Sequence, residues 1–153
     1  MARTHAAFGL LCALCALFFI SFFSKDMIIP VVAVIFALVP DIDTPKSFVG
    51  RRLGPISYVI NFLFGHRRLF HAVWLPTLLF VVFARFNLSV AIGIAIGYLS
   101  HLVLDLSNDR GIQPLYPLRF HISGPFKTGG FFEVLIFIVI VSSDFLILLR
   151  IFG

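Results

Sequence analysis

Long apolar runs constrain this sequence more than any other feature. Five runs of 13 to 19 residues are separated by polar segments and cover 6–23, 27–39, 69–84, 88–106 and 131–149. A helix of roughly 20 residues crosses the hydrocarbon core of a bilayer. Hydrophobic residues make up 60% of the 153 residues and charged residues 12%, whereas soluble domains average about 45–50% and about 25%. The sequence therefore excludes a soluble domain and predicts an all-α, polytopic membrane helix bundle.

The lengths of the runs predict about five transmembrane helices in a single membrane-embedded domain that covers residues 1–153. The segment 56–64 is apolar but too short to cross, and Pro55 suits the first turn of a helix. We expect it to form a short interfacial or re-entrant helix. Gly93 and Gly97 are four residues apart in the fourth run, which predicts close packing of that helix against a neighbour.

Basic residues predict the orientation. The chain has twelve Lys and Arg against seven Asp and Glu, and cytoplasmic loops collect Lys and Arg. If the loop 41–68 is cytoplasmic, nine basic residues lie on that side and three, Lys25, Arg85 and Arg150, on the other. We therefore predict a multi-pass protein of the cell (inner) membrane with a cytoplasmic N-terminus. Because orientation accounts for the positive charge, we do not expect a nucleic-acid partner.

Histidine and aspartate residues gather at the ends of the predicted helices that share the cytoplasmic side. Ionisable side chains near membrane depth are costly and therefore mark candidate sites. The residues are His5, Asp41, Asp43, His66, His71, His101 and Asp105. The topology was derived from Lys and Arg alone, so this convergence is an independent observation.

The spacing of these residues favours a metal site. His101 and Asp105 are four apart and share one face of a helix. Asp41 and Asp43 would point to one side if their segment is extended. His66 and His71 are five apart, so a bend between them, or two separate roles, is needed. Each motif alone also fits an ordinary structural role, namely a hydrogen-bonded pair, a helix cap or a solvated charge. Together the motifs favour a shared site.

Imidazole and carboxylate ligands suit zinc first, and also manganese or iron. The predicted metal ligands are His5, Asp41, His71, His101 and Asp105. They exceed the four that one zinc needs, so we expect one or two divalent ions.

Asp43 and His66 are the predicted catalytic residues, as proton acceptors. Arg67 and Arg51 are the predicted substrate-binding residues, because guanidinium groups bind phosphate oxygens bidentately. His121 and Glu133 are weaker candidates, and the sequence holds no organic-cofactor motif.

An ordered set of short motifs resembles one known family. The set comprises Thr4-His5, Leu38 to Asp43, Ser47 with Gly50 to Arg52, His66 to His71, Gly97 to Asp105 and Gly111 to Pro117. It resembles the YdjM-like family of LexA-binding, inner-membrane-associated proteins of bacteria and archaea, for which a metal-dependent hydrolase activity has been suggested. The resemblance implies a metal site more firmly than it implies a reaction.

The pattern is more loosely similar to zinc-dependent phospholipase C, which also combines an early His, a separate Asp, a further His and a His-x3-Asp pair. That similarity implies a phosphoester substrate.

Our leading hypothesis is a membrane-embedded, metal-dependent hydrolase that acts on a phosphoester of a lipid or another amphipathic molecule at the cytoplasmic face. Membrane lipid would then surround the protein and also be a candidate substrate. One alternative is a non-enzymatic membrane adaptor that binds a cytoplasmic protein. The other is a metal or proton transporter, although clustering at one side of the membrane argues against an ion path.

Overall fold

A computed structural model describes residues 1–20, 26–127 and 129–152. The end of the first predicted run, residues 21–23, and Lys25 lie outside the described residues. The described part is all helical and holds no β-strand, with seven α-helices and two 3-10 helices. They are α1 (Ala2–Ile20), α2 (Ile28–Phe36), η1 (Val39–Asp43), α3 (Gly50–Leu53), α4 (Pro55–Phe64), η2 (Leu69–His71), α5 (Trp74–Ala84), α6 (Leu88–Leu106) and α7 (Phe131–Phe152).

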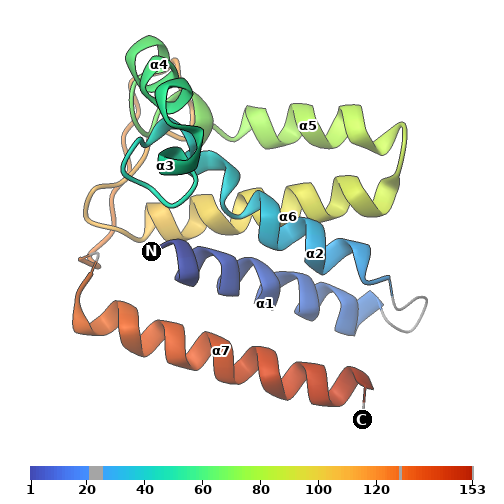
Figure 1. Cartoon of the computed structure of the whole chain (residues 1–153). Coiled ribbons are helices and arrows are strands. Elements are labelled where there is room, and N and C mark those ends of the chain that lie inside the picture. The colour runs from blue at the N-terminus through green and yellow to red at the C-terminus, as the bar shows by residue number, and fades with distance from the viewer. Residues whose placement is uncertain (21–25, 128, 153) are drawn as a thin grey trace.

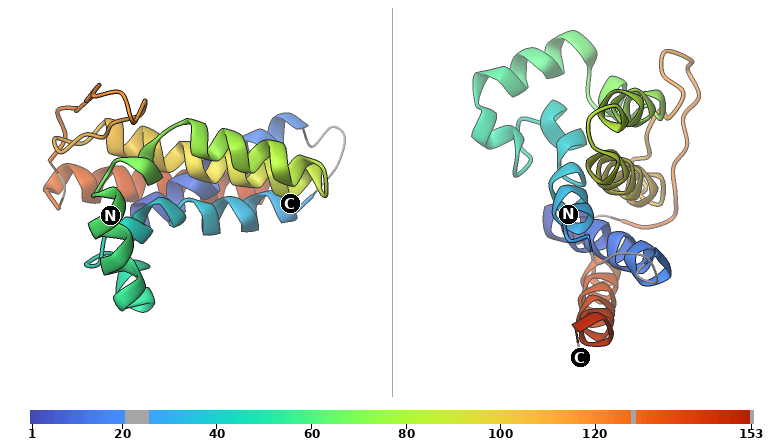
Figure 2. Two further views of the ribbon diagram at one scale, coloured as in Figure 1. Left: turned by 90° about the horizontal axis from the view of Figure 1, so that it is seen from above. Right: turned by 90° about the vertical axis from the view of Figure 1, so that its right-hand side faces the viewer.

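Helix α6 is the centre of the bundle. It packs against α1, α2 and α5, while α7 packs on the outer side of α1. The long helices run side by side, and the short α3 and α4 cross them at the end that also holds the N-terminus (Figure 1). The C-terminus lies at the opposite end. The two further views show the same layering and the outlying position of α7 (Figure 2).

Three helices, α1, α6 and α7, are long and apolar enough to cross a membrane. Helix α2 has nine residues and α5 has eleven, so neither alone spans about 30 Å at 1.5 Å per residue. The run predicted to begin at Leu69 is not one continuous helix. Leu69–His71 form a 3-10 turn, Ala72 is extended, and α5 begins at Trp74, where Pro76, which lacks an N–H, suits its first turn.

Small residues let α6 and α2 approach closely. A Cβ atom on Gly97 would lie 2.1 Å from the carbonyl oxygen of Ala33, and one on Gly93 would lie 2.8 Å from that of Ile29. Only glycine fits at these two positions, and the predicted close packing is confirmed. Buried aliphatic residues continue the contact into α1 and form a core of Ala13, Leu17, Ile29 and Ala33.

Two connecting segments cover the end of the bundle near the N-terminus. The first contains α3 and α4; the predicted helix at 56–64 is confirmed, and its Phe62 side chain is 88% exposed. The second, 107–127, folds back over the end of α6 and reaches the start of α5, where Val73 N–H donates to Pro114 O at 2.9 Å and Trp74 Nε1 to Tyr116 O at 2.7 Å. These segments enclose the polar cluster described next.

Candidate metal centre

Histidine and aspartate side chains from four elements meet at the covered end of the bundle. His5 comes from the first turns of α1, Asp41 and Asp43 from η1, His71 from η2, and His101 and Asp105 from the last turns of α6. All except Asp41 are at least 95% buried. The segment 39–43 is a 3-10 helix rather than extended, because Pro40 sits at its start, yet both aspartates still reach the cluster.

The orientation of His101 is fixed from outside the cluster. Its Nδ1 lies 2.7 Å from the carbonyl oxygen of Ala37. A carbonyl can only accept, so the ring proton sits on Nδ1 and the lone pair on Nε2. That Nε2 faces Asp105, 3.7 Å from Oδ2, and has no hydrogen-bond partner. A backbone carbonyl that sets the tautomer in this way is typical of metal-binding histidines.

His71 lies between two carboxylates. Its Nδ1 is 3.3 Å from Asp43 Oδ2 and its Nε2 is 3.2 Å from Asp105 Oδ2. The imidazole is fully buried. This order, in which an outer carboxylate contacts one ring nitrogen and the other nitrogen faces a shared centre, matches the carboxylate–histidine–metal arrangement.

His5 closes the cluster from the α1 side. Its Nε2 lies 3.6 Å from Asp105 Oδ1, and its ring stacks on that of His101 with centroids 4.0 Å apart. Two groups of ligand atoms result, each within 4.8 Å of one another: His5 with His101 and Asp105, and Asp41 with His71 and His101. The five predicted ligands therefore lie together, and His101 belongs to both groups.

The cluster fits a divalent metal ion on two counts. Ligand atoms about 2.0–2.2 Å from one tetrahedral ion lie roughly 3.3–3.6 Å apart, close to the contacts of 3.2 to 3.7 Å made with Asp105 by His5, His71 and His101. In addition, His71 Nε2, His101 Nε2 and Asp105 Oδ2 are buried without a hydrogen-bond partner. Buried polar atoms are rarely left unsatisfied, and a shared cation would satisfy these three together.

Asp43 contacts His71 at Nδ1, the ring nitrogen that faces away from Asp105, and both of its carboxylate oxygens have further partners. Its Oδ1 contacts His66 Nδ1 at 3.2 Å and accepts from Thr44 Oγ1 at 2.9 Å, and its Oδ2 accepts from the backbone N–H of Arg67 at 2.9 Å. Burial alone would raise the pKa of the Asp43 carboxyl, but the contacts with His66 and His71 and the hydrogen bond from the Arg67 amide hold this pKa well below its usual range. Asp43 is therefore a carboxylate with both oxygens engaged.

The bend needed between His66 and His71 is present. Arg67 has a φ of 59°, an uncommon conformation for a residue other than glycine. It turns the chain so that both histidines face Asp43, with their ring centroids 6.3 Å apart. The two differ in exposure, because the His66 side chain is 41% exposed and that of His71 is fully buried.

The two predicted phosphate-binding arginines lie in different places. Arg67 is mostly buried, and its guanidinium donates to Asp105 Oδ1 and to the carbonyl oxygen of Gly111, both at 3.1 Å. Arg51 is exposed, donates from Nε to Ser47 O at 3.3 Å, and lines a separate cavity with Arg3 and Lys46. The structure therefore joins Arg67 to the cluster and leaves Arg51 out of it.

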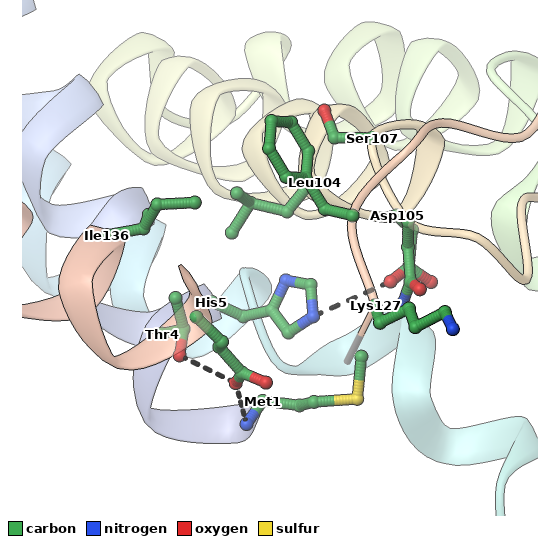
Figure 3. Close-up of a pocket in the computed structure, with 11 residues that line it drawn as sticks. Met1, Thr4, His5, Leu104, Asp105, Ser107, Lys127 and Ile136 are labelled. Carbon is green, nitrogen blue, oxygen red and sulfur yellow. Dashed lines mark hydrogen bonds and ion pairs between the residues drawn. The ribbon is translucent and has the colours of Figure 1, made fainter. Parts of the chain in front are cut away.

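A small cavity of about 70 Å³ borders the cluster at His5 and Asp105. Its wall combines the apolar side chains of Leu104 and Ile136 with Thr4 and Lys127 (Figure 3). His5 Nε2 points toward the Asp105 carboxylate at the edge of this cavity.

Sequence reasoning missed three residues around the cluster. Lys127 counted only toward the orientation and received no role at the site, because it lies in an irregular loop far from the other residues in sequence. Thr4 and Gly111 belonged to the motifs of the family resemblance but received no role there. Thr4 donates to Glu133 Oε1 at 3.0 Å and so joins α1 to α7. Of the weaker candidates, Glu133 lines the cavity, whereas the exposed His121 is in neither group of ligand atoms among the described residues.

The fold and the cluster together define a small helical membrane protein with a buried His/Asp centre at one end of its bundle. The chain belongs to the YdjM inner membrane protein family, whose family model matches residues 1–151. The match identifies it as a member of an inner-membrane protein family, as the sequence motifs predicted.

Two relatives illustrate how far the similarity extends. The chain is 29% identical over 138 residues to the uncharacterized protein YvsG of Bacillus subtilis (strain 168), covering 88% of this chain and 85% of YvsG. It is 37% identical over 103 residues to the inner membrane protein YdjM of Escherichia coli (strain K12), covering 61% of this chain and 51% of YdjM. The chain therefore spans about half the length of that second relative. No solved structure matches.

Proposed function

We propose that this protein is a membrane-embedded, metal-dependent hydrolase that acts on a phosphoester of a lipid or another amphipathic molecule. The observation that carries the proposal is the group of unpartnered buried ligand atoms on His71, His101 and Asp105, next to a cavity at one end of an apolar bundle. A closed structural site would not need a cavity at its edge, whereas a hydrolytic site needs room for water and substrate.

The proposed ligands are His5, Asp41, His71, His101 and Asp105, for one or two ions, with zinc favoured by the mixed nitrogen and oxygen donors. A divalent ion there supplies Lewis-acid activation of water and of a phosphoryl oxygen. The remaining roles fall to the chain's own residues.

Asp43 orients His71, because its carboxylate contacts His71 Nδ1 and is fully engaged by other donors. This assigns Asp43 a positioning role rather than the direct proton acceptance expected from the sequence. His66, whose side chain is 41% exposed and contacts Asp43, keeps the proposed role of proton acceptor. Arg67 fixes one oxygen of Asp105 and leaves Oδ2 toward His71 and His101. Lys127 beside the cavity is the cation placed to meet a phosphate oxygen.

For the membrane we propose five crossings, with the cluster end at the cytoplasm. Helices α1, α6 and α7 are the long crossings, and the segments 27–39 and 69–84 complete the other two. Two observations support this: η1 and η2 meet the N-terminal part of α1 at the cluster, and the termini lie at opposite ends of the bundle, as an odd number of crossings requires. Reporter fusions near Lys46 and after Arg150 should therefore read as cytoplasmic and external, respectively.

The test is hydrolysis by the purified full chain in detergent micelles that contain a phospholipid, with a chromogenic phosphodiester as a second substrate. Chelator should abolish turnover, and zinc or manganese should restore it. Asp105→Asn should lower turnover by at least about 10³-fold, because it removes a charged ligand with little change of shape. Asp109→Asn, an exposed acid at the same end, is the matched control.

Full metal occupancy without turnover of any phosphoester would contradict the hydrolase. In that case the cluster would be a structural centre, and the adaptor alternative would take precedence. Metal-dependent movement of protons or metal ions across sealed vesicles, without hydrolysis, would instead support the transporter.

A further inference from the structure

A second and larger cavity lies at the same end of the molecule, beside α1. It has a volume of about 740 Å³ and is bounded by α1, α7 and the segment that leads into α3. This is within the range of roughly 300–1,000 Å³ that small-molecule sites occupy in proteins. None of the five proposed metal ligands lines it. The cavity is therefore separate from the metal centre.

One part of this cavity is basic. Arg3 of α1, Lys46 of the segment that leads into α3 and Arg51 of α3 itself line it together. All three are exposed, and none forms an ion pair with a carboxylate within the described part of the chain. The one acid in the wall, Glu133, already binds the N-terminal amine, the Thr4 hydroxyl and the Gly129 N–H. The cavity thus presents three uncompensated cations.

The other part of the cavity is apolar. Phe48, Val134 and Phe137 line it, and Val134 is 55% exposed on α7. Only 11% of the residues of α7 that could cross a membrane are buried inside the protein, so this side of the cavity continues onto the outer, apolar surface of that helix. A ligand here meets cations from α1 and the 46–51 stretch and apolar side chains from α7.

We propose that this cavity binds an anionic phospholipid taken from the surrounding bilayer. Arg3, Lys46 and Arg51 hold the phosphate and the charged headgroup, and one acyl chain lies against Val134 and Phe137. Basic residues close to the surface of a membrane attract anionic lipids, and Arg binds phosphate oxygens bidentately. The apolar wall distinguishes a lipid from a soluble phosphate ester, because only the lipid gains by covering it. The inference goes beyond the proposed hydrolase and does not depend on it.

The test is lipid binding by the purified full chain in detergent, measured by native mass spectrometry with phosphatidylglycerol and phosphatidylcholine of equal chain length. We expect at least about fivefold tighter binding of phosphatidylglycerol. The triple variant Arg3→Gln, Lys46→Gln, Arg51→Gln should lose at least about tenfold of this binding. The matched control is Arg110→Gln with Arg119→Gln, two exposed arginines of the 107–127 segment.

Two further measurements distinguish binding of the whole lipid from binding of its phosphate group, and distinguish lipid binding from the proposed hydrolysis. Phe137→Asn should weaken phosphatidylglycerol binding, while glycerol phosphate at the same concentration should not displace the lipid. Asp105→Asn should bind the lipid as the unaltered chain does, which makes a failure of this proposal distinguishable from a failure of the hydrolase. Equal binding of the two lipids, an equal loss in the control variant, or displacement by glycerol phosphate would overturn the proposal.

Discussion

Helices α6 and α7 are both long and apolar enough to cross a membrane, yet they occupy opposite positions in the bundle. Half of α6 is buried inside the protein, against 11% of the corresponding part of α7. Helix α6 packs against α1, α2 and α5, whereas α7 packs on α1. Both helices carry an aspartate that is at least 95% buried, Asp105 in α6 and Asp144 in α7. Only Asp105 lies among histidines.

This difference shows what determines the place of an apolar helix within a membrane protein. Lipid tails are as apolar as leucine, so hydrophobicity gives no preference for the centre of a bundle. Helix α6 is central because Gly93 and Gly97 let its backbone meet α2, and because His101 and Asp105 must avoid lipid. Helix α7 has no such glycine pair and presents bulky side chains such as Phe145, 62% exposed, to its surroundings.

The largest expected effect is at Gly97. Replacing it by valine forces a side chain into the backbone of α2, where a Cβ atom would lie 2.1 Å from Ala33 O. We expect a loss of about 3 kcal/mol or more of stability, seen as a strongly lowered thermal midpoint in detergent. The matched change in α7, Val139→Leu at a 57% exposed position, should stay within about 0.5 kcal/mol. Similar losses in both variants would break the distinction between the two helices.

The second prediction concerns metal content. His101→Ala should reduce bound zinc from at least one equivalent to below about 0.1, as measured by elemental analysis after dialysis, because His101 belongs to both groups of ligand atoms. His121→Ala, an exposed histidine at the same end, should leave the content unchanged. If the His101 variant retained its metal, the metal would bind at a site that does not include His101.

A smaller effect is expected from Asp43. Asp43→Asn keeps the shape but removes the charge that faces His71 Nδ1, and loss of such an outer carboxylate typically lowers metal affinity about 10- to 100-fold. Competition with a chromophoric chelator would measure the change. The exposed Asp109 serves as the control position. A complete loss of binding would instead make Asp43 a ligand.

The smallest effect concerns the aspartate of α7. Asp144 is 5% exposed and its Oδ1 has no hydrogen-bond partner, and an unsatisfied buried polar atom costs about 1–3 kcal/mol. Asp144→Leu should therefore increase the free energy of unfolding by about 1 kcal/mol, measured as a raised thermal midpoint in detergent. A loss of stability would instead show that Asp144 has a structural partner.

The sequence predicted the helical class, the glycine contact and the meeting of residues from four separate segments. It could do so because apolar length, the spacing of small residues and the cost of ionisable groups in membranes are local properties of the chain. It did not predict where Arg67 would point, since this depends on a positive φ at that residue and on the carbonyl of Gly111, 44 residues further along. Nor did it predict the separation of Arg51 from Arg67, because Asp105 and Gly111 hold Arg67 whereas Arg51 lies exposed on α3.

The outlying position of α7 has a consequence for the order of synthesis. Every proposed ligand, together with the Gly111 carbonyl that holds Arg67, precedes the last forty or so residues of the sequence. Translation at roughly 5–20 residues per second leaves a few seconds between completion of these residues and of α7. The ligand cluster can therefore assemble on the nascent chain before α7 arrives, and Glu133 and Ile136 of α7 then complete the wall of the cavity beside it. Metal loading can precede formation of that cavity.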